Sequence, residues 1–255
     1  MIRVNSLNKS LEDKQVLTDI CIDFENGKTN LIIGRSGSGK TVLMKCIVGL
    51  LTPEHGEILY DGRDLVRMKK KEKKLLRSEM GMIFQSAALF DSMSVLENVM
   101  FPLDMFSGAT YSERVKRARF CLDRVNLIEA QHKYPGEISG GMQKRVAIAR
   151  AIALNPKYLF CDEPNSGLDP KTSLVIDALI HDITEEYNMT TIINTHDMNS
   201  VMGIGDKITF ISEGHKEWEG TKNDVFTSNN ESLDDFIFAS DLLRRVKIME
   251  QEKRI

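Results

Sequence analysis

Residues 31–53 constrain the possible folds of this 255-residue chain more than any other segment. Leu31-Ile32-Ile33 is a continuous apolar run suited to a buried strand, and it stops at Gly34. After a glycine-rich turn, apolar residues recur at helical spacing from about Lys40 to Leu51, and Pro53 lies just beyond. Strand, glycine-rich turn and helix in this order open a βαβ unit, so the chain is predicted to be an α/β protein. The helical positions are Val42, Leu43, Cys46, Ile47 and Leu50.

The turn itself has the spacing of a phosphate-binding loop: Gly, four residues, Gly, Lys, then Ser or Thr. It reads Gly34-Arg35-Ser36-Gly37-Ser38-Gly39-Lys40-Thr41. Glycines let backbone N–H groups turn inward around phosphate oxygens. The N-terminus of the following helix, whose first turn includes Val42, adds its dipole. Lys40 is expected to reach the β- and γ-phosphates, and Thr41 to offer its hydroxyl to Mg²⁺. The residues from Gly34 to Val42 are therefore predicted to bind a nucleotide.

Two adjacent acids follow a second apolar strand, Tyr158-Leu159-Phe160-Cys161. Ligands of open α/β sheets bind beyond the carboxyl ends of the strands. Asp162 is therefore expected to hold magnesium, and Glu163 to polarise an attacking water. Two acids at a strand end are often only solvated surface, but a phosphate-binding loop in the same chain favours the catalytic interpretation.

Other elements are predicted from periodicity. Alternation at Ile20, Ile22 and Phe24 indicates a half-buried strand, and strands are also expected at 81–84, 191–195 and in a hairpin joined by Glu213-Gly214. One helix is expected to begin behind Ser112 as its N-cap, and another at Pro170. Their predicted buried faces are Val115, Ala118, Leu122 and Val125 in the first helix, and Val175, Leu179 and Ile183 in the second.

The segment Ser139-Gly140-Gly141-Met142-Gln143, at the start of a predicted helix, resembles the signature motif of ABC ATPases. The family's other landmarks follow in the expected order: Gln85 as the Q-loop glutamine, Ser166–Asp169 as the D-loop, and His196 as the switch histidine. The resemblance covers about residues 1–220. It implies the ABC ATPase form of the P-loop NTPase fold: a RecA-like core, an N-terminal antiparallel β subdomain and an inserted α-helical subdomain.

The resemblance also implies how the site works. Two copies would pack head to tail around ATP and Mg²⁺, so that the phosphate-binding loop of one copy faces the signature segment of the other. Glu163, His196 and Gln85 would be the catalytic residues, and Gln85 would join Thr41 and Asp162 as a metal ligand. The nucleotide contacts from across the interface would be Ser139, Gly140, Gly141, Met142, Gln143 and Asp169.

One landmark departs from the family pattern. Many relatives stack an aromatic residue near the N-terminus on the adenine, whereas this chain has Leu11 in the segment 7–16. Apolar contact from Leu11 and Val16 is expected to hold the base, with looser selectivity because stacking is missing.

The predicted domain organisation is an ABC ATPase domain over 1–227, with its helical subdomain at about 87–157, and a helical tail over 228–255. Residues 240–255 are expected to pack on the second copy, with packing on the chain's own domain as the alternative. A net charge of −3 gives no bulk attraction to nucleic acid. The basic run 69–74 is interpreted as a solvated helix face, with contact to anionic lipid headgroups as the alternative.

No apolar run approaches the roughly 20 residues that cross a bilayer, and the N-terminus lacks the apolar stretch of a secretion signal. Three of the four cysteines, Cys21, Cys46 and Cys161, lie among aliphatic residues and are expected to be buried thiols. The fourth is Cys121.

The stretch from Phe84 to Leu103, with Phe84-Gln85-Ser86-Ala87-Ala88-Leu89-Phe90, resembles the Mla/Mce group of bacterial lipid-transport ATPases. This implies phospholipid transport between inner and outer membrane, with an MlaE-like permease and a periplasmic Mce-domain protein as partners. The chain would then lie at the cytoplasmic face of the inner membrane. Polar amino-acid and methionine importers share many of these features and are the alternative. No sustained heptads separate Lys40 from Ser139, which disfavours the coiled-coil ABC ATPases that act outside transport.

In the same stretch, four apolar side chains are candidates for a groove that receives a helix of the permease. The alternative is that they only pack the helical subdomain. They are Leu89, Phe90, Met93 and Val95.

Overall fold

The computed structural model describes residues 1–238, 245 and 247. The chain divides into two compact units, Met1–Met68 with Asn194–Ile255, and Lys69–Ile193. Helix α8 (Glu231–Ile237) agrees with a helical start of the predicted tail. The expectation for 240–255 falls outside the described residues.

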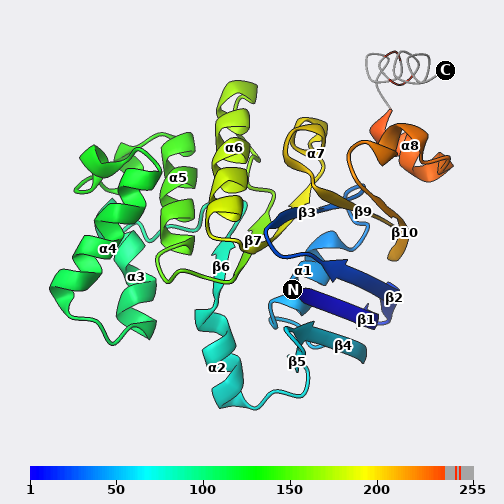
Figure 1. Cartoon of the computed structure of the whole chain (residues 1–255), viewed down its shortest axis with the longest axis horizontal. Helices are drawn as coiled ribbons and strands as arrows, with labels where there is room; N and C mark the ends of the chain where they lie inside the picture. The colour runs from blue at the N-terminus through cyan, green and yellow to red at the C-terminus, as the bar shows by residue number, and fades with distance from the viewer. Residues whose placement is uncertain (239–244, 246, 248–255) are drawn as a thin grey trace. The chain divides into compact units, whose positions relative to one another are not determined.

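The first unit holds a four-stranded antiparallel sheet in the order β2-β1-β4-β5 (Figure 1). The predicted alternation in β2 is confirmed, because Ile20, Ile22 and Phe24 are all buried. β1 carries a register shift between Val4 and Leu7, and Ser6 between them has a φ of 44°. This bulge breaks the period of two along β1. The strands are β1 (Ile2–Leu11), β2 (Lys14–Phe24), β4 (His55–Tyr60) and β5 (Arg63–Asp64).

The same unit contains β3 (Lys28–Ile33), which is parallel to β9 (Lys207–Ser212). β9 and β10 (His215–Gly220) form the predicted hairpin, and its turn residues Glu213 and Gly214 have φ of 47° and 81°. The remaining elements are helix α7 (Met198–Ile204) and the 3₁₀ turn η3 (Asp224–Thr227).

Helix α1 (Lys40–Ile47) follows β3 and is shorter than predicted. Gly49 has a φ of 72°, a left-handed conformation that stops a helix. Leu50 lies beyond this break and is 59% exposed, so the prediction that it shares the buried helix face is wrong.

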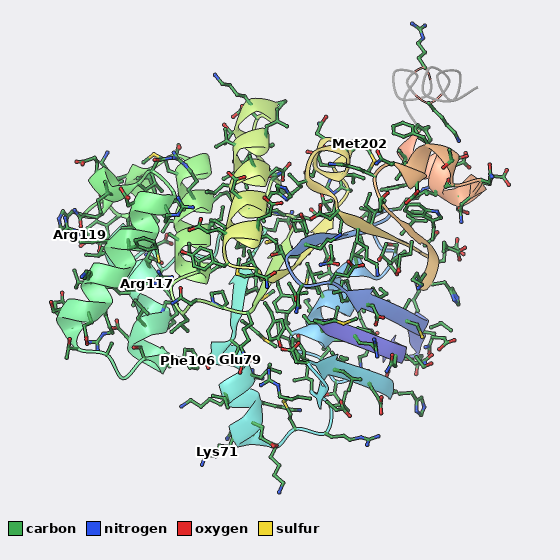
Figure 2. All side chains as sticks on the ribbon, viewed as in Figure 1. Lys71, Glu79, Phe106, Arg117, Arg119 and Met202 are labelled. Atoms are coloured by element: carbon green, nitrogen blue, oxygen red, sulfur yellow. The ribbon has the colours of Figure 1, made fainter. Side chains whose placement is uncertain are left out.

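The second unit packs three helices together, α3 (Val95–Phe106), α4 (Tyr111–Arg124) and α5 (Gly140–Ala151), drawn in green in Figure 1. Arg117 of α4, labelled in Figure 2, donates hydrogen bonds to the carbonyls of Ile152 and Ala153. It therefore satisfies carbonyl groups left open where α5 ends. The other elements are α2 (Lys70–Ser78), β6 (Met80–Ile83), the 3₁₀ turns η1 (Ile128–Ala130) and η2 (Pro135–Glu137), β7 (Tyr158–Asp162), α6 (Pro170–Glu186) and β8 (Thr190–Thr195), whose last two residues belong to the first unit.

The N-cap of α4 is Thr110, and the prediction of Ser112 is wrong. The Thr110 side chain accepts from the backbone N–H of Glu113, while the Glu113 carboxylate accepts from the backbone and hydroxyl of Thr110. This reciprocal capping box satisfies two otherwise open groups, which Ser112 in the first turn does not do.

The buried face of α6 is rotated relative to the prediction. Val175 is 53% exposed and Leu179 only half-buried, whereas Ile176, Ile180 and Ile183 are fully covered. The buried face also includes Asp177, whose carboxylate accepts a 2.6 Å hydrogen bond from the Asn165 amide. A search for an apolar stripe passes over this face because buried polar residues interrupt it.

Three cysteines are buried, namely Cys46, Cys121 and Cys161, but Cys21 is exposed and its predicted burial is wrong. Cys21 lies between Ile20 and Ile22 on β2, so the pleat turns it to the opposite face of the strand. Helix α2 bears the basic run, and only Leu76 of that helix is buried, consistent with a solvated face. Across the described residues, no helix combines the length and apolarity needed to cross a membrane.

Candidate nucleotide site

The phosphate-binding loop lies between β3 and α1 in the first unit. Lys40 is buried, and its ammonium group donates to the carbonyls of Gly34 at 2.7 Å and Arg35 at 3.0 Å. The loop is therefore wrapped around the cation that the sequence assigns to the phosphates.

Two glycines of this loop are required by the structure. Gly34 has a φ of 152°, and a Cβ there would lie 2.1 Å from the backbone oxygen of Ile211. Gly39, the N-cap of α1, has a φ of 107°, and its Cβ would lie 2.8 Å from Leu17 Cδ2. Side chains at these positions would force the backbone out of its path.

The loop fits a polyphosphate chemically. Arg35, Ser36 and Gly37 are exposed, and the exposed Thr41 lies in the first turn of α1. The buried Ser38 hydroxyl has no hydrogen-bond partner within the part of the chain that the structure describes. An orphaned hydroxyl inside a glycine-rich turn, a buried ammonium and a helix N-terminus are the groups that hold phosphate oxygens.

Of the two residues assigned to the base, the structure places Val16 beside this loop. A Cβ at Gly39 would lie 3.1 Å from the Val16 carbonyl oxygen and 3.7 Å from Val16 Cγ1. Leu11 ends β1, pairs with Lys14 in the hairpin and is 40% exposed.

The two acids lie at the carboxyl end of β7 in the second unit, as predicted. Asp162 is the last residue of the strand, and Glu163 has a left-handed φ of 48°, an uncommon conformation for a non-glycine residue. A turn follows, closed by the 3.1 Å hydrogen bond from the Ser166 N–H to the Glu163 carbonyl. Gln85 follows β6, which is parallel to β7, and its amide donates to the Ser166 hydroxyl at 3.0 Å. The structure thus brings Gln85 to the turn that follows the two acids.

Lys144 of α5 also belongs to this group. It is 5% exposed, and its ammonium group donates to the Gln85 carbonyl. Burial lowers the pKa of Lys144, and the negative charge of Glu163 acts in the opposite direction. Sequence reasoning missed this residue, because Lys144 lies between Gln143 and Arg145 and looks like part of a polar turn of the helix.

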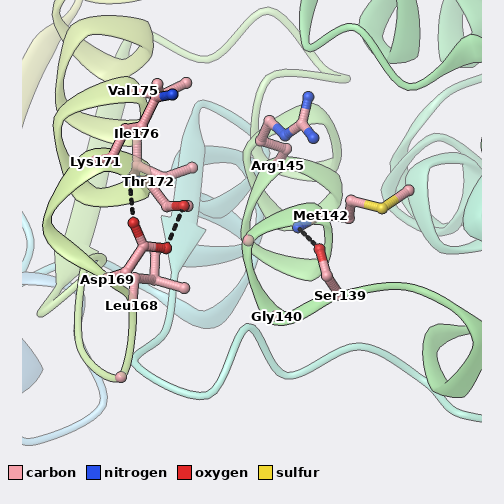
Figure 3. A pocket seen from close by; sticks show the side chains of 12 residues that line it. Ser139, Gly140, Met142, Arg145, Leu168, Asp169, Lys171, Thr172, Val175 and Ile176 are labelled. Atoms are coloured by element: carbon pink, nitrogen blue, oxygen red, sulfur yellow. Dashed lines mark hydrogen bonds between the residues drawn. The ribbon is translucent and has the colours of Figure 1, made fainter.

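The signature segment and the D-loop line one cavity of about 500 Å³ (Figure 3). Ser139 is the N-cap of α5 and accepts from the Met142 N–H at 3.3 Å. Asp169 is the N-cap of α6 and accepts from the Thr172 N–H and hydroxyl at 3.0 and 2.5 Å. Both hydrogen bonds lower the pKa of Asp169, and the bond from the Thr172 hydroxyl has the larger effect. Asp169 therefore presents an ionised carboxylate to the cavity. The cavity is lined by Ser139, Gly140, Gly141, Met142, Arg145, Gly167, Leu168, Asp169, Lys171, Thr172, Val175 and Ile176.

Gly141 is required where α5 approaches α6, because a Cβ there would lie 2.7 Å from Thr172 Cγ2. Gln143 is turned elsewhere, since its amide donates to the Pro135 carbonyl at 2.9 Å and Gln143 does not line the cavity. Of the predicted signature contacts, the structure therefore brings four to the cavity together with Asp169.

His196 directly follows β8 and is exposed, in the first unit. Within the described residues, no three His, Cys, Asp or Glu side chains converge on one point. The predicted magnesium ligands are of mixed kind: the Thr41 hydroxyl on α1, the Gln85 amide after β6 and the Asp162 carboxylate on β7.

The profile of the family described as ABC transporter matches residues 17–166, which include the phosphate-binding loop, the signature segment and both acids. The chain therefore belongs to the ABC transporter family as an ATP-binding subunit. It has the ABC ATPase cassette fold, an α/β fold with a mixed parallel sheet and an antiparallel β subdomain, and it is an ABC transporter ATPase.

Curated relatives carry different transport names. The chain is 36% identical over 236 residues to the probable ribonucleotide transport ATP-binding protein mkl of Mycobacterium leprae, covering 92% of this chain and 68% of the relative. It is 37% identical over 233 residues to the methionine import ATP-binding protein MetN of Clostridioides difficile, covering 91% and 72%.

Two solved structures are similar. The dimeric structure of MJ0796, a bacterial ABC transporter cassette, matches with a TM-score of 0.79 and 32% identity. The match covers 87% of this chain and 99% of the MJ0796 chain. The protein cbiO1 of Clostridium perfringens, part of the ABC transporter complex cbiONQ, has a TM-score of 0.83 and 29% identity, covering 100% and 98%.

Proposed function

We propose that two copies of this chain close head to tail on ATP and, through a separate membrane permease, drive solute transport at the cytoplasmic face of the bacterial inner membrane. The observation that carries the proposal is the cavity between the signature segment and the D-loop. It presents an N-cap hydroxyl and an ionised carboxylate, yet no residue of the phosphate-binding loop lines it. A nucleotide held by the loop of a second copy would complete it, and the MJ0796 cassette is itself dimeric.

Each residue has a defined task in this proposal. Lys40 and the loop N–H groups bind the phosphates, and Val16 with Leu11 covers the base. Thr41, Asp162 and Gln85 hold Mg²⁺, which when bound neutralises phosphate charge. Glu163 accepts a proton from the attacking water, and His196 orients that water. Ser139 and Asp169 of the second copy complete the phosphate contacts.

The test is the variant Glu163→Gln. It removes the proton acceptor but keeps the side-chain volume, so it should bind ATP, stop turnover and accumulate as dimers in size-exclusion chromatography. The matched control is Glu129→Gln, an exposed position outside the site. Normal hydrolysis by Glu163→Gln would refute the role of Glu163, and absence of an ATP-dependent dimer would refute the head-to-tail arrangement.

Two cargo classes follow from different observations. The MetN relatives favour import of methionine or a similar polar solute. The segment 84–103 favours phospholipid transport with an MlaE-like permease and a periplasmic Mce-domain protein, and rests on sequence resemblance alone. Relatives of nearly equal identity are named for ribonucleotides and for methionine, so the named relatives supply no single cargo.

The segment 84–103 offers a place for the permease. A cavity of about 530 Å³ is lined mainly by apolar side chains, including the exposed Phe84 and Phe90. Among the four groove candidates, the assignment of Val95 is wrong, because this side chain is fully buried. Leu89 and Met93 are half-buried and do not line the cavity. Phe90 also contacts Phe101, with ring centroids 4.7 Å apart and the rings tilted by 50°, so it packs on its own unit and still lines the groove.

Purification with the membrane partner separates the two cargo classes. Extraction and mass spectrometry of the complex should yield bound phospholipid and an Mce-domain protein in one case, and a solute-binding protein with methionine in the other. The variant Phe90→Glu should release the permease while ATP binding by the isolated chain is retained. Undiminished permease retention would refute the groove.

A further inference from the structure

The segment that follows the Q-loop glutamine has an unusual backbone. Ala87 and Ala88 have left-handed φ of 61° and 48° in direct succession. A non-glycine residue in this region costs on the order of 1 kcal/mol or more, so two together persist only when neighbouring groups hold them. Part of the restraint is local, since the Ala87 N–H donates to the Phe84 carbonyl at 3.0 Å.

The other restraint comes from the signature helix α5, through two cationic side chains. Lys144 is 5% exposed and donates to the Gln85 carbonyl. Arg150 donates from its two terminal nitrogens to the carbonyls of Ala87 and Ala88, both at 2.7 Å. One helix therefore holds three of the four carbonyl groups between Gln85 and Ala88 by charge-assisted hydrogen bonds.

These contacts fix a side chain as well as a backbone. The Gln85 amide reaches the Ser166 hydroxyl at 3.0 Å, and Ser166 closes the turn that begins at Glu163. A shift of the Gln85 carbonyl by a fraction of the hydrogen-bond length would therefore move its amide away from this turn. The signature helix α5, whose N-cap is Ser139, thus sets the position of Gln85 through its backbone carbonyl.

We propose that Lys144 and Arg150 are positioning residues that hold Gln85 in its working position and so tie the rate of ATP hydrolysis to the placement of the signature helix. The proposal rests on the proposed function, because it assigns a step of hydrolysis to Gln85. Lys144 and Arg150 reach the site through the Gln85–Ala88 backbone, and the charge of Lys144 also interacts with that of Glu163.

The test measures ATP hydrolysis by the full chain for Lys144→Gln and Arg150→Gln. Misplacement of a reactive group by about 1 Å costs up to a hundredfold, so kcat should fall about tenfold or more while KM for ATP changes less than about twofold. Lys144→Arg keeps a charged donor and should restore most of the rate. The controls are Lys116→Gln and Arg119→Gln on α4, both exposed, with Arg119 at the outer edge of the helices in Figure 2.

A double-mutant cycle with Gln85→Ala separates positioning from a structural role, since that variant keeps the Gln85 carbonyl but loses the amide. In this background Lys144→Gln and Arg150→Gln should change kcat by less than about twofold. An equal loss in both backgrounds, or no loss in either, would overturn the proposal. If Lys144→Gln does not fold, Arg150→Lys, which can reach only one carbonyl, should give an intermediate rate, and full rate there would also overturn it. Absence of hydrolysis by the unmodified chain would instead count against the proposed function.

Discussion

Replacing Gly34 by alanine tests whether the phosphate-binding loop is fixed by the hairpin that packs on it. The new Cβ would lie 2.1 Å from the backbone oxygen of Ile211 and 2.8 Å from the Ser38 hydroxyl oxygen. The first atom belongs to β9, which is paired to both β3 and β10, so it has no flexible end that moves away. Either the loop or the strand must shift.

The expected cost has two parts. A non-glycine residue at this φ costs about 1–2 kcal/mol, and overpacking against fixed atoms adds about 1–3 kcal/mol. Together this is about 4 kcal/mol, or a melting temperature about 12 °C lower for a domain of this size. ATP affinity should fall as well, because the carbonyl of residue 34 holds the Lys40 ammonium group.

Gly62→Ala is the matched control. Gly62 has a φ of 81°, but no atom lies within 4 Å of its Cβ position, so only the conformational cost remains. Its melting temperature should fall by about 4 °C, with ATP binding unchanged. Calorimetry and fluorescent nucleotide titration measure both variants. If Gly34→Ala melts no lower than Gly62→Ala, the argument from the Ile211 contact fails.

Four further outcomes are expected. Burial raises the pKa of the Cys46 thiol to about 11, which favours its neutral form in the folded chain. The contribution of this thiol to the free energy of unfolding should therefore be constant below about pH 9 and be lost as the pH rises through about 11. Urea unfolding midpoints measured against pH would show this decline. Exposed Cys21 should react with iodoacetamide at pH 8 while Cys46 stays unmodified until the chain unfolds, and equal rates would contradict the burial. Without adenine stacking, ATP and GTP should compete within about tenfold, and Leu11→Tyr should tighten ATP about tenfold; a strong ATP preference of the unmodified chain would contradict this. Asn98→Ala should cost about 3 kcal/mol in calorimetry, because its buried amide bonds the backbone of Phe90, Met93 and Ser94; a change within 0.5 kcal/mol would mean that water replaces it.

Local chemistry made most of the site readable from sequence. A glycine-rich turn between an apolar strand and a helix, and acids at a strand end, express backbone and charge requirements of a few adjacent residues. The loop, the two acids, the signature segment and the D-loop accordingly lie on the elements predicted for them. The cargo is not readable in this way, because the motifs of an ATPase subunit describe nucleotide chemistry and not the transported molecule.

Errors arose where distant groups set the outcome. The buried face of α6 includes Asp177, whose hydrogen-bond partner Asn165 lies outside the helix. The apolar pattern of the helix alone therefore does not indicate this face. The error at the N-cap of α4 was local instead: Thr110 with Glu113 three positions later is a capping box that the sequence already contains, and it outweighs Ser112.

The sequence alone therefore determined the order of motifs, the phosphate chemistry and the family, because these depend on residue types at short spacing. Only the tertiary structure decided which side chains hold those motifs in place. Lys144 and Arg150 lie about sixty positions after the carbonyls they bind. Ile211 limits Gly34 from an even more distant strand. Hydrogen bonds and steric contacts depend on distance in space, and the fold alone brings these residues within that distance.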